Sequence, residues 1–240
     1  MLHLNPTVFV VDPDASVRAS LEAAIRLTGW TPATFESVGA FLAHRPPTGP
    51  SCLVVEVTLP ELAGFDLLRR ISADRTATPI IAVAGHSDIP MTVGAMKAGA
   101  VEFLMKPLTG DVVLTAVAHA IARSRATLDR EAELVELRNR YDSLSGREQE
   151  VMVWVVTGHL NKRIGSTLGI SEITVKAHRG KVMRKMRAKS LAELVLMAMR
   201  LRLPPAPVAS TPPATSRSIG YDMSGSLQRL TTDHASRIAV

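Results

Sequence analysis

Residues 144–195 read LSGREQEVMVWVVTGHLNKRIGSTLGISEITVKAHRGKVMRKMRAKSLAELV, and this stretch decides the fold of the C-terminal part. Ser145, Asn161, Ser171 and Ser190 each stand before apolar residues spaced three or four apart, so each is expected to cap a helix. Gly169 is suited to end the second of these helices, because glycine adopts the left-handed conformation that helix ends require. The stretch therefore predicts an all-α unit of four consecutive helices.

The second and third of these helices have the layout of a helix-turn-helix unit, with a tight turn through Gly169 and Ile170. Placing the third helix at 100° per residue gives it an inward stripe of Val175, Val182 and Met186. The opposite face carries its basic and small residues, which are Lys176, Ala177, Gly180, Lys181 and Arg184. Positive charge is therefore presented outward, with Lys176 placed for a base edge or a phosphate and Lys181 and Arg184 for phosphates.

The charge of the chain is divided along its length. Residues 1–122 carry 8 Lys/Arg against 11 Asp/Glu, whereas residues 141–203 carry 12 against 5. A basic unit joined to a mildly acidic one suggests a control module coupled to a polyanion-binding module, with nucleic acid as the first candidate. A solvated charge run, or an amphipathic helix for a calmodulin-like partner or a membrane surface, remains the alternative.

The composition favours a soluble globular protein rather than a membrane protein. The 240 residues are 46% apolar and 21% charged, and no apolar run approaches the roughly 18 residues that span a bilayer. The N-terminus has no secretory-leader pattern, and the single cysteine, Cys52, stands in an apolar run and is expected to be a core residue. We therefore expect a cytoplasmic protein of one or two domains.

The first 120 residues alternate short β-rich runs with helical patterns. The runs are 7–12, 31–35, 51–57, 79–84 and 101–104. This alternation predicts an α/β domain at 1–122 with a doubly wound, five-stranded parallel sheet. In such a sheet the functional crevice lies at the carboxyl ends of the strands, which directs attention to Asp12, Glu56, Ala84 and Lys106.

Two further segments complete the expected organisation. Residues 123–140 continue a helical pattern without Pro or Gly, and they are predicted to form a helical linker or simply a solvated helix. The helix-turn-helix domain then occupies 141–203. Residues 204–240, rich in Pro, Ser and Thr, are predicted to be a disordered tail.

These residues together resemble a known family. The stretch at 144–195 resembles a LuxR-type DNA-binding domain, while VFVVDPD, VEVTLPELAG and IAVAGHSDIPMTVGAMKAGAVEFLMKP resemble a receiver domain, and the combination is similar to the NarL/FixJ response regulators. The resemblance implies a scaffold helix at 161–168 and a recognition helix at 172–187. It implies DNA contacts from Asn161, Lys162, Thr174, Lys176, Ala177, Arg179, Gly180, Lys181 and Arg184, and dimer contacts from Leu194, Val195 and Met199.

The resemblance also implies partners. Double-stranded DNA with two-fold-related half-sites, a second copy of the chain and RNA polymerase are expected, and a cognate histidine kinase is left open. No membrane contact and no catalytic residue are expected.

The receiver-like pocket keeps the framework of the family but not its chemistry. Where the family has two adjacent acids, a phosphoaccepting Asp and a hydroxyl residue, this chain has Asp12-Pro13, Glu56 and Ala84. Lys106-Pro107 is retained and would resemble the family's cis peptide bond. Asp14 follows one residue late, and Phe103 stands at the usual aromatic switch position.

These changes predict that Mg²⁺ binding is weak or absent, and no other cofactor or metal is expected. Mg²⁺ requires oxygen ligands in near-octahedral geometry, and Pro13 offers none. The longer Glu56 side chain is expected to approach Lys106 directly and to place negative charge roughly where a phosphate would sit. The alternative to this regulatory role is an ion-pair cluster of Asp12, Glu56 and Lys106 that only stabilises the fold.

Three functions are therefore compared. The leading hypothesis is a sequence-specific transcription regulator whose receiver domain does not depend on Asp phosphorylation. The second is a conventional two-component regulator that accepts phosphate on Asp12 or Asp14. The third is an α/β enzyme using Asp12, Glu56 and Lys106, which the absence of a Gly-rich phosphate loop, a metal-ligand spacing and a nucleophile elbow makes the weakest.

Overall fold

A computed structural model describes residues 5–62, 64–86 and 88–204 of the chain. The tail expected to be disordered lies, apart from Pro204, outside these residues. Within the described part, no helix is both long enough and apolar enough to cross a membrane.

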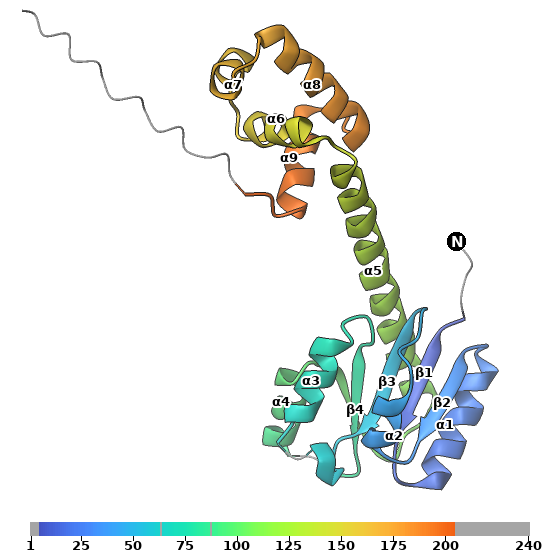
Figure 1. The fold of residues 1–240 in the computed structure, drawn as a ribbon. Helices are drawn as coiled ribbons and strands as arrows, with labels where there is room; N and C mark the ends of the chain where they lie inside the picture. The colour runs from blue at the N-terminus through green and yellow to red at the C-terminus, as the bar shows by residue number, and fades with distance from the viewer. Residues whose placement is uncertain (1–4, 63, 87, 205–240) are drawn as a thin grey trace, which may run out of the picture. The chain divides into compact units, whose positions relative to one another are not determined.

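The N-terminal residues form the predicted five-stranded parallel sheet (Figure 1). Its strands are β1 Thr7–Val11, β2 Thr31–Phe35, β3 Ser51–Glu56, β4 Ile80–Ala84 and β5 Ala100–Met105. The order is β2-β1-β3-β4-β5. The strand after β1 is added on one side of it, and β3, β4 and β5 are added on the other side. Strands β3 and β4 are buried along their whole length, as expected for strands that helices cover on both faces.

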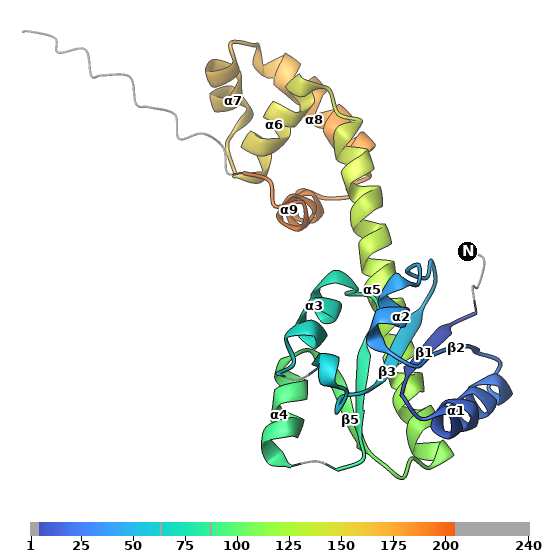
Figure 2. The ribbon, with the colours of Figure 1, turned by 60° about the horizontal axis from the view of Figure 1, so that its bottom comes forward.

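Helices cover both faces of this sheet (Figures 1 and 2). They are α1 Ala15–Leu27, α2 Val38–Ala43, α3 Asp66–Asp74, α4 Ile89–Lys97 and α5 Gly110–Asp142, with a short 3-10 turn, η1, at Pro60–Leu62. One apolar core joins α2, α3 and α4 to one face, and a second joins α1 and α5 to the other. Cys52 is fully buried in the second core, which confirms it as a core residue. This burial raises the pKa of its thiol to about 12.

Helix α5 continues without a break from the α/β domain through the segment expected to be helical. Its first half packs on the sheet, where the buried Ser124 accepts a hydrogen bond from the Ser51 backbone at 2.9 Å and donates one to the Ala77 carbonyl at 2.5 Å. These hydrogen bonds give the buried hydroxyl its partners, because burying a hydroxyl without a hydrogen bond would destabilise the fold. They also tie the helix to the starting ends of β3 and β4.

Four helices follow, as predicted: α6 Gly146–Val156, α7 Asn161–Leu168, α8 Glu172–Met186 and α9 Leu191–Arg200. Ser145 forms a complete capping box with Glu148, and the Ser171 side chain accepts from the Thr174 backbone. Gly169 ends α7 with φ 67°, the left-handed conformation for which glycine is suited.

One expected cap is wrong. Asn161 is the first residue of α7 rather than its cap, Leu160 stands at the cap position, and no side chain caps this helix. The Oδ1 atom of Asn161 is buried and has no hydrogen-bond partner among the described residues. A cap at Asn161 would start the helix one residue late, whereas the range 161–168 implied by the family resemblance agrees with the structure.

Candidate functional site

The carboxyl ends of the strands bring the predicted pocket residues together. Asp12 follows β1, Glu56 ends the neighbouring β3, and Lys106 follows β5. Asp12 is 3% exposed and Glu56 is 4% exposed, so both acids lie within the protein rather than on its surface. Buried acids require partners, because an unpaired buried charge is costly.

Lys106 supplies the partner for both acids. Its Nζ lies 2.6 Å from Oδ2 of Asp12 and 2.8 Å from Oε2 of Glu56. The approach of Glu56 to Lys106 expected from the longer side chain is therefore present. Burial lowers the pKa of Lys106, but hydrogen bonds and charge attraction from the two acids outweigh it, so the pKa lies above its ordinary value.

The second oxygen of Glu56 is held by a residue that sequence reasoning missed. Thr58 donates to Oε1 of Glu56 from its backbone N–H at 3.0 Å and from its hydroxyl at 2.7 Å. This local turn fixes the carboxylate and turns its other oxygen towards Lys106. The signal was a hydroxyl residue two positions after the acid, which is the spacing of such turns.

The residues around Asp12 are also engaged. The Asp14 backbone N–H donates to Oδ1 of Asp12 at 2.9 Å, and the Asp14 side chain caps α1 by accepting from the Ser16 backbone. Hydrogen bonds from the hydroxyl and backbone of Ser16 lower the pKa of Asp14. Arg18, which sequence reasoning also missed, donates to the carbonyls of Asp12 and Pro13 at 2.8 and 2.9 Å.

The carboxylate oxygens of this pocket already have partners within the protein. Both oxygens of Asp12 and both oxygens of Glu56 already accept hydrogen bonds or pair with Lys106, and Asp14 is exposed and occupied as a helix cap. Mg²⁺ demands carboxylate oxygens and waters at about 2.1 Å, which would displace the lysine. Among the described residues, no group of three or more His, Cys, Asp and Glu side chains could hold a metal ion.

Ala84 and Phe103 complete the predicted pocket. Ala84 ends β4, is fully buried and carries no hydroxyl that could bind a phosphoryl oxygen. Phe103 is half-buried and packs against the core shared with α2, α3 and α4. The aromatic ring is thus held against the apolar core rather than in the ion cluster.

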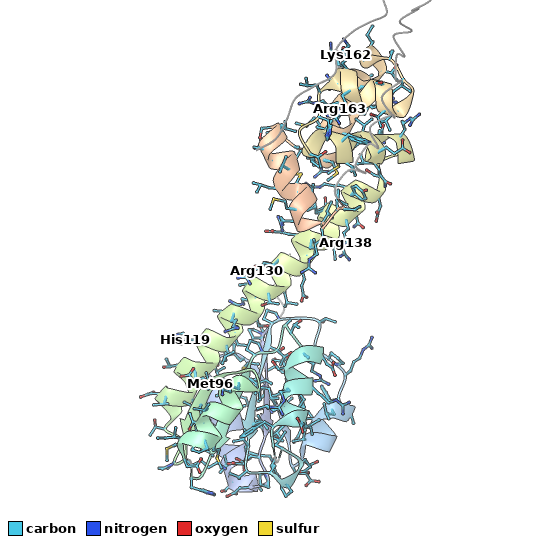
Figure 3. All side chains as sticks on the ribbon, turned by 90° about the vertical axis from the view of Figure 1, so that its left-hand side faces the viewer. Met96, His119, Arg130, Arg138, Lys162 and Arg163 are labelled. Carbon is cyan, nitrogen blue, oxygen red and sulfur yellow. The ribbon has the colours of Figure 1, made fainter. Side chains whose placement is uncertain are left out.

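In the helical domain, α8 is oriented as the sequence predicts. Val175, Val182 and Met186 are buried. The exposed residues include Lys176, Ala177, Gly180, Lys181 and Arg184, while Thr174 and Arg179 are half-buried. The basic face is therefore available to a ligand, with Lys162 and Arg163 exposed on the neighbouring α7 (Figure 3).

Three details of this face were not foreseen. Lys176 pairs with Glu172 one turn earlier, at 3.1 Å between Nζ and Oε1. Thr174 is used locally, because its hydroxyl lies 2.8 Å from that of Ser171. Ile173 is 79% exposed on the same helix, although sequence reasoning considered only its basic and small residues.

The expected dimer contacts on α9 need one correction. Leu194 is fully buried in the core of the helical domain, so it is not available to a second chain. Val195 is half-buried, and Met199 is 69% exposed. Leu196, at 61% exposed, joins Met199 on the outer side of α9, so the exposed apolar side of this helix differs from the set of residues expected.

A partly buried ion pair links α6 to α8 in the helical domain. Glu148 is 4% exposed, and its Oε2 lies 2.7 Å from Nζ of Lys185 on α8. Lys185 also donates to the Ser143 carbonyl at the end of α5, at 3.0 Å. Hydrogen bonds from Lys185 and from the Ser145 backbone lower the pKa of Glu148 to about 2.

The ion pair between Glu148 and Lys185 predicts a pH-dependent contribution to the free energy of unfolding. A carboxylate with a lowered folded pKa stabilises above its unfolded pKa, and the benefit disappears as pH falls from about 4.5 towards 2. We expect Glu148→Gln to lower the melting temperature of the helical domain at pH 7 by about 5 °C. The gap between variant and parent should shrink at pH 3, and the surface control Glu150→Gln should show little effect at either pH. A gap of unchanged size at pH 3 contradicts the assignment.

The fold and the two sites define a class of protein: a regulator in which a receiver-like α/β domain is joined to a helix-turn-helix domain. Comparison with family models agrees, because residues 8–118 match the response regulator receiver domain and residues 142–198 match the bacterial regulatory proteins of the luxR family.

Relatives match across both domains. Nodulation protein W of Bradyrhizobium diazoefficiens is 44% identical over 194 residues, covering 81% of this chain and 86% of that protein. The transcriptional regulatory protein FixJ of Rhizobium meliloti is 39% identical over 196 residues, covering 80% and 95%. The solved structure of the response regulator StyR matches with a TM-score of 0.70 and 40% identity, covering 82% of this chain and all of that one.

The chain therefore belongs to the NarL/FixJ family of response regulators, with a LuxR-type DNA-binding domain. It is a transcription regulator and not an enzyme, so the weakest of the three hypotheses is set aside.

Proposed function

We propose that this regulator binds its operator as a dimer without phosphorylation of its receiver domain. The observation that carries the proposal is Lys106 bound by both Asp12 and Glu56 at 2.6 and 2.8 Å. In this arrangement Glu56 supplies, as a fixed carboxylate, negative charge near the lysine that a phosphoryl group would otherwise contact. Abundance, a partner protein or a small ligand then sets the output.

The described residues of the pocket also lack the free carboxylate oxygen and the hydroxyl group that phosphorylation requires, which favours the same proposal. A phosphoacceptor must present a free oxygen in line with the donor, and both oxygens of Glu56 are engaged. A displacement of about 1 Å can cost on the order of a hundredfold in rate. The buried Ala84 offers no hydroxyl to the incoming group. Phosphate transfer to Asp12 or Asp14 from a histidine kinase is the competing proposal.

The DNA-binding surface is proposed to combine two kinds of contact. Lys176, in the second turn of α8, reaches a base edge or phosphate once it leaves Glu172, while Lys181 and Arg184 contact phosphates. Ala177 and Gly180 allow the helix to approach the floor of the groove. Such a short helix reads few base pairs, so two copies related by a two-fold axis are needed for useful specificity.

The proposed dimer contacts lie on α9, where Leu196 and Met199 are exposed apolar residues on one side of the helix. RNA polymerase is the proposed partner at the promoter, as for a transcription regulator in general.

One selection experiment tests these proposals together. The full chain, purified without phosphodonor or Mg²⁺, is expected to enrich a two-fold-related sequence from a randomised duplex library. Lys176→Ala should weaken binding to the enriched duplex by about 1 to 3 kcal/mol if the side chain reads a base. Lys181→Ala should weaken specific and nonspecific binding alike and lower the salt dependence by about one phosphate contact.

The failures are distinguishable. Enrichment that begins only when a phosphodonor and Mg²⁺ are added contradicts phosphorylation-independent control. Enrichment of a single half-site contradicts the dimer, and equal loss of specificity for both variants contradicts the assignment of Lys176 to a base.

A further inference from the structure

An isoleucine, Ile173, lies on the basic face of α8 near the amino end of the helix. Ile173 is 79% exposed, so among the described residues its side chain is not part of an apolar core and is accessible to a ligand. Setting Val175 at zero and turning about 100° per residue places Ile173 near 160°, between Gly180 near 140° and Arg184 near 180°. It therefore projects from the middle of the basic face.

The position of Ile173 along the helix also favours contact with DNA bases. Ile173 is the second residue of α8, and the amino-terminal residues of a recognition helix are those that reach base edges. Ala177 and Gly180 follow it one and two turns later, both exposed and small. The three make an apolar strip, which Lys176 and Lys181 border on either side. Nothing in this strip can form a side-chain hydrogen bond to a base.

The chemistry of the major groove identifies what such a strip can recognise. Among the base edges presented there, the C5-methyl group of thymine is the apolar one. A branched aliphatic side chain in contact with that methyl removes apolar surface of both from water. Cytosine lacks the methyl, so the contact discriminates without any hydrogen bond.

We propose that Ile173 is a specificity-determining residue that contacts a thymine methyl in each half-site. The inference rests on the proposed DNA-binding function and names one base that the recognition helix reads.

The test replaces deoxythymidine by deoxyuridine, whose base differs only in lacking the methyl group. In the duplex enriched by the full chain, one substitution at a fixed position of the half-site should weaken binding about fourfold, as expected for loss of one buried methyl. Ile173→Ala should bind the thymine and uracil duplexes equally. Ile173→Val should retain part of the difference. Ile173 is exposed and alanine is a better helix former, so the variant is expected to fold.

Lys181→Ala is the matched control, because it should weaken binding to the thymine and uracil duplexes by the same factor. The proposal is overturned if no uracil substitution affects the parent, if Ile173→Ala keeps the full thymine preference, or if the enriched half-sites share no thymine. It is also overturned if Ile173→Ala leaves DNA binding unchanged but abolishes binding to RNA polymerase, which would make Ile173 a protein contact. If no duplex is enriched at all, it is the proposed DNA-binding function that fails.

Discussion

Glu56→Gln is expected to destabilise the receiver domain by about 1 to 3 kcal/mol and to weaken dimerisation and DNA binding. Glu56 uses both oxygens as acceptors, one for Thr58 and one for Lys106. Glutamine has a single acceptor oxygen, so either Thr58 or Lys106 loses its partner and faces an NH₂ group instead. The size of the loss is moderate because Asp12 still pairs with Lys106, whose side chain is 22% exposed.

Two control variants separate the causes of this effect. Glu61→Gln changes an exposed acid of η1 and should leave stability and DNA binding unchanged. Thr58→Val keeps the charge of Glu56 but removes the hydroxyl that orients it. Urea unfolding gives the stability, and sedimentation with DNA titration gives the assembly and affinity. If Glu56→Gln dimerises and binds DNA as the parent does, the carboxylate does not substitute for phosphate and the cluster is only structural.

The second large effect is a gain of phosphorylation by a variant with three substitutions. Glu56→Asp combined with Pro13→Asp and Ala84→Thr restores an acceptor, a second acid and a hydroxyl, and it is expected to take up phosphate from acetyl phosphate with Mg²⁺. Glu56→Asp alone should not, since Pro13 still offers no carboxylate and Ala84 no hydroxyl. Ala84 is fully buried, so Ala84→Thr alone serves as the folding control. Intact mass detects the phosphoryl group directly.

Phosphate uptake by Glu56→Asp alone would show that Pro13 and Ala84 do not prevent phosphorylation, which contradicts the prediction. No uptake by the folded triple variant would show that the pocket departs from a working receiver in more than these positions.

Much of the fold follows from local patterns that many residues share. The capping residues Ser145 and Ser171 and the apolar stripe of Val175, Val182 and Met186 agree with one another, so both the helices and their buried faces were predictable. The meeting of Asp12, Glu56 and Lys106 was also predictable, because parallel strands place their carboxyl ends at one edge of the sheet.

What could not be predicted depends on tertiary packing or on single local bonds. The apolar residues of α9 lie on more than one side of the helix, and only packing against α6 shows that Leu194 is inside while Leu196 is outside. Asn161 has a residue type that favours a cap, but the helix begins one residue earlier than a cap there would require. Ile173 was overlooked because apolar residues are assigned to cores by default.

The most direct test of phosphorylation-independent control is incubation of the parent chain with acetyl phosphate and Mg²⁺. Intact mass, sedimentation and affinity for the enriched duplex are measured before and after, with the triple variant as the positive control. Glu56, already paired with Lys106 at 2.8 Å, predicts no added phosphoryl group and no change in assembly or affinity. Stoichiometric phosphorylation of Asp12 or Asp14, accompanied by tighter DNA binding, would contradict the account.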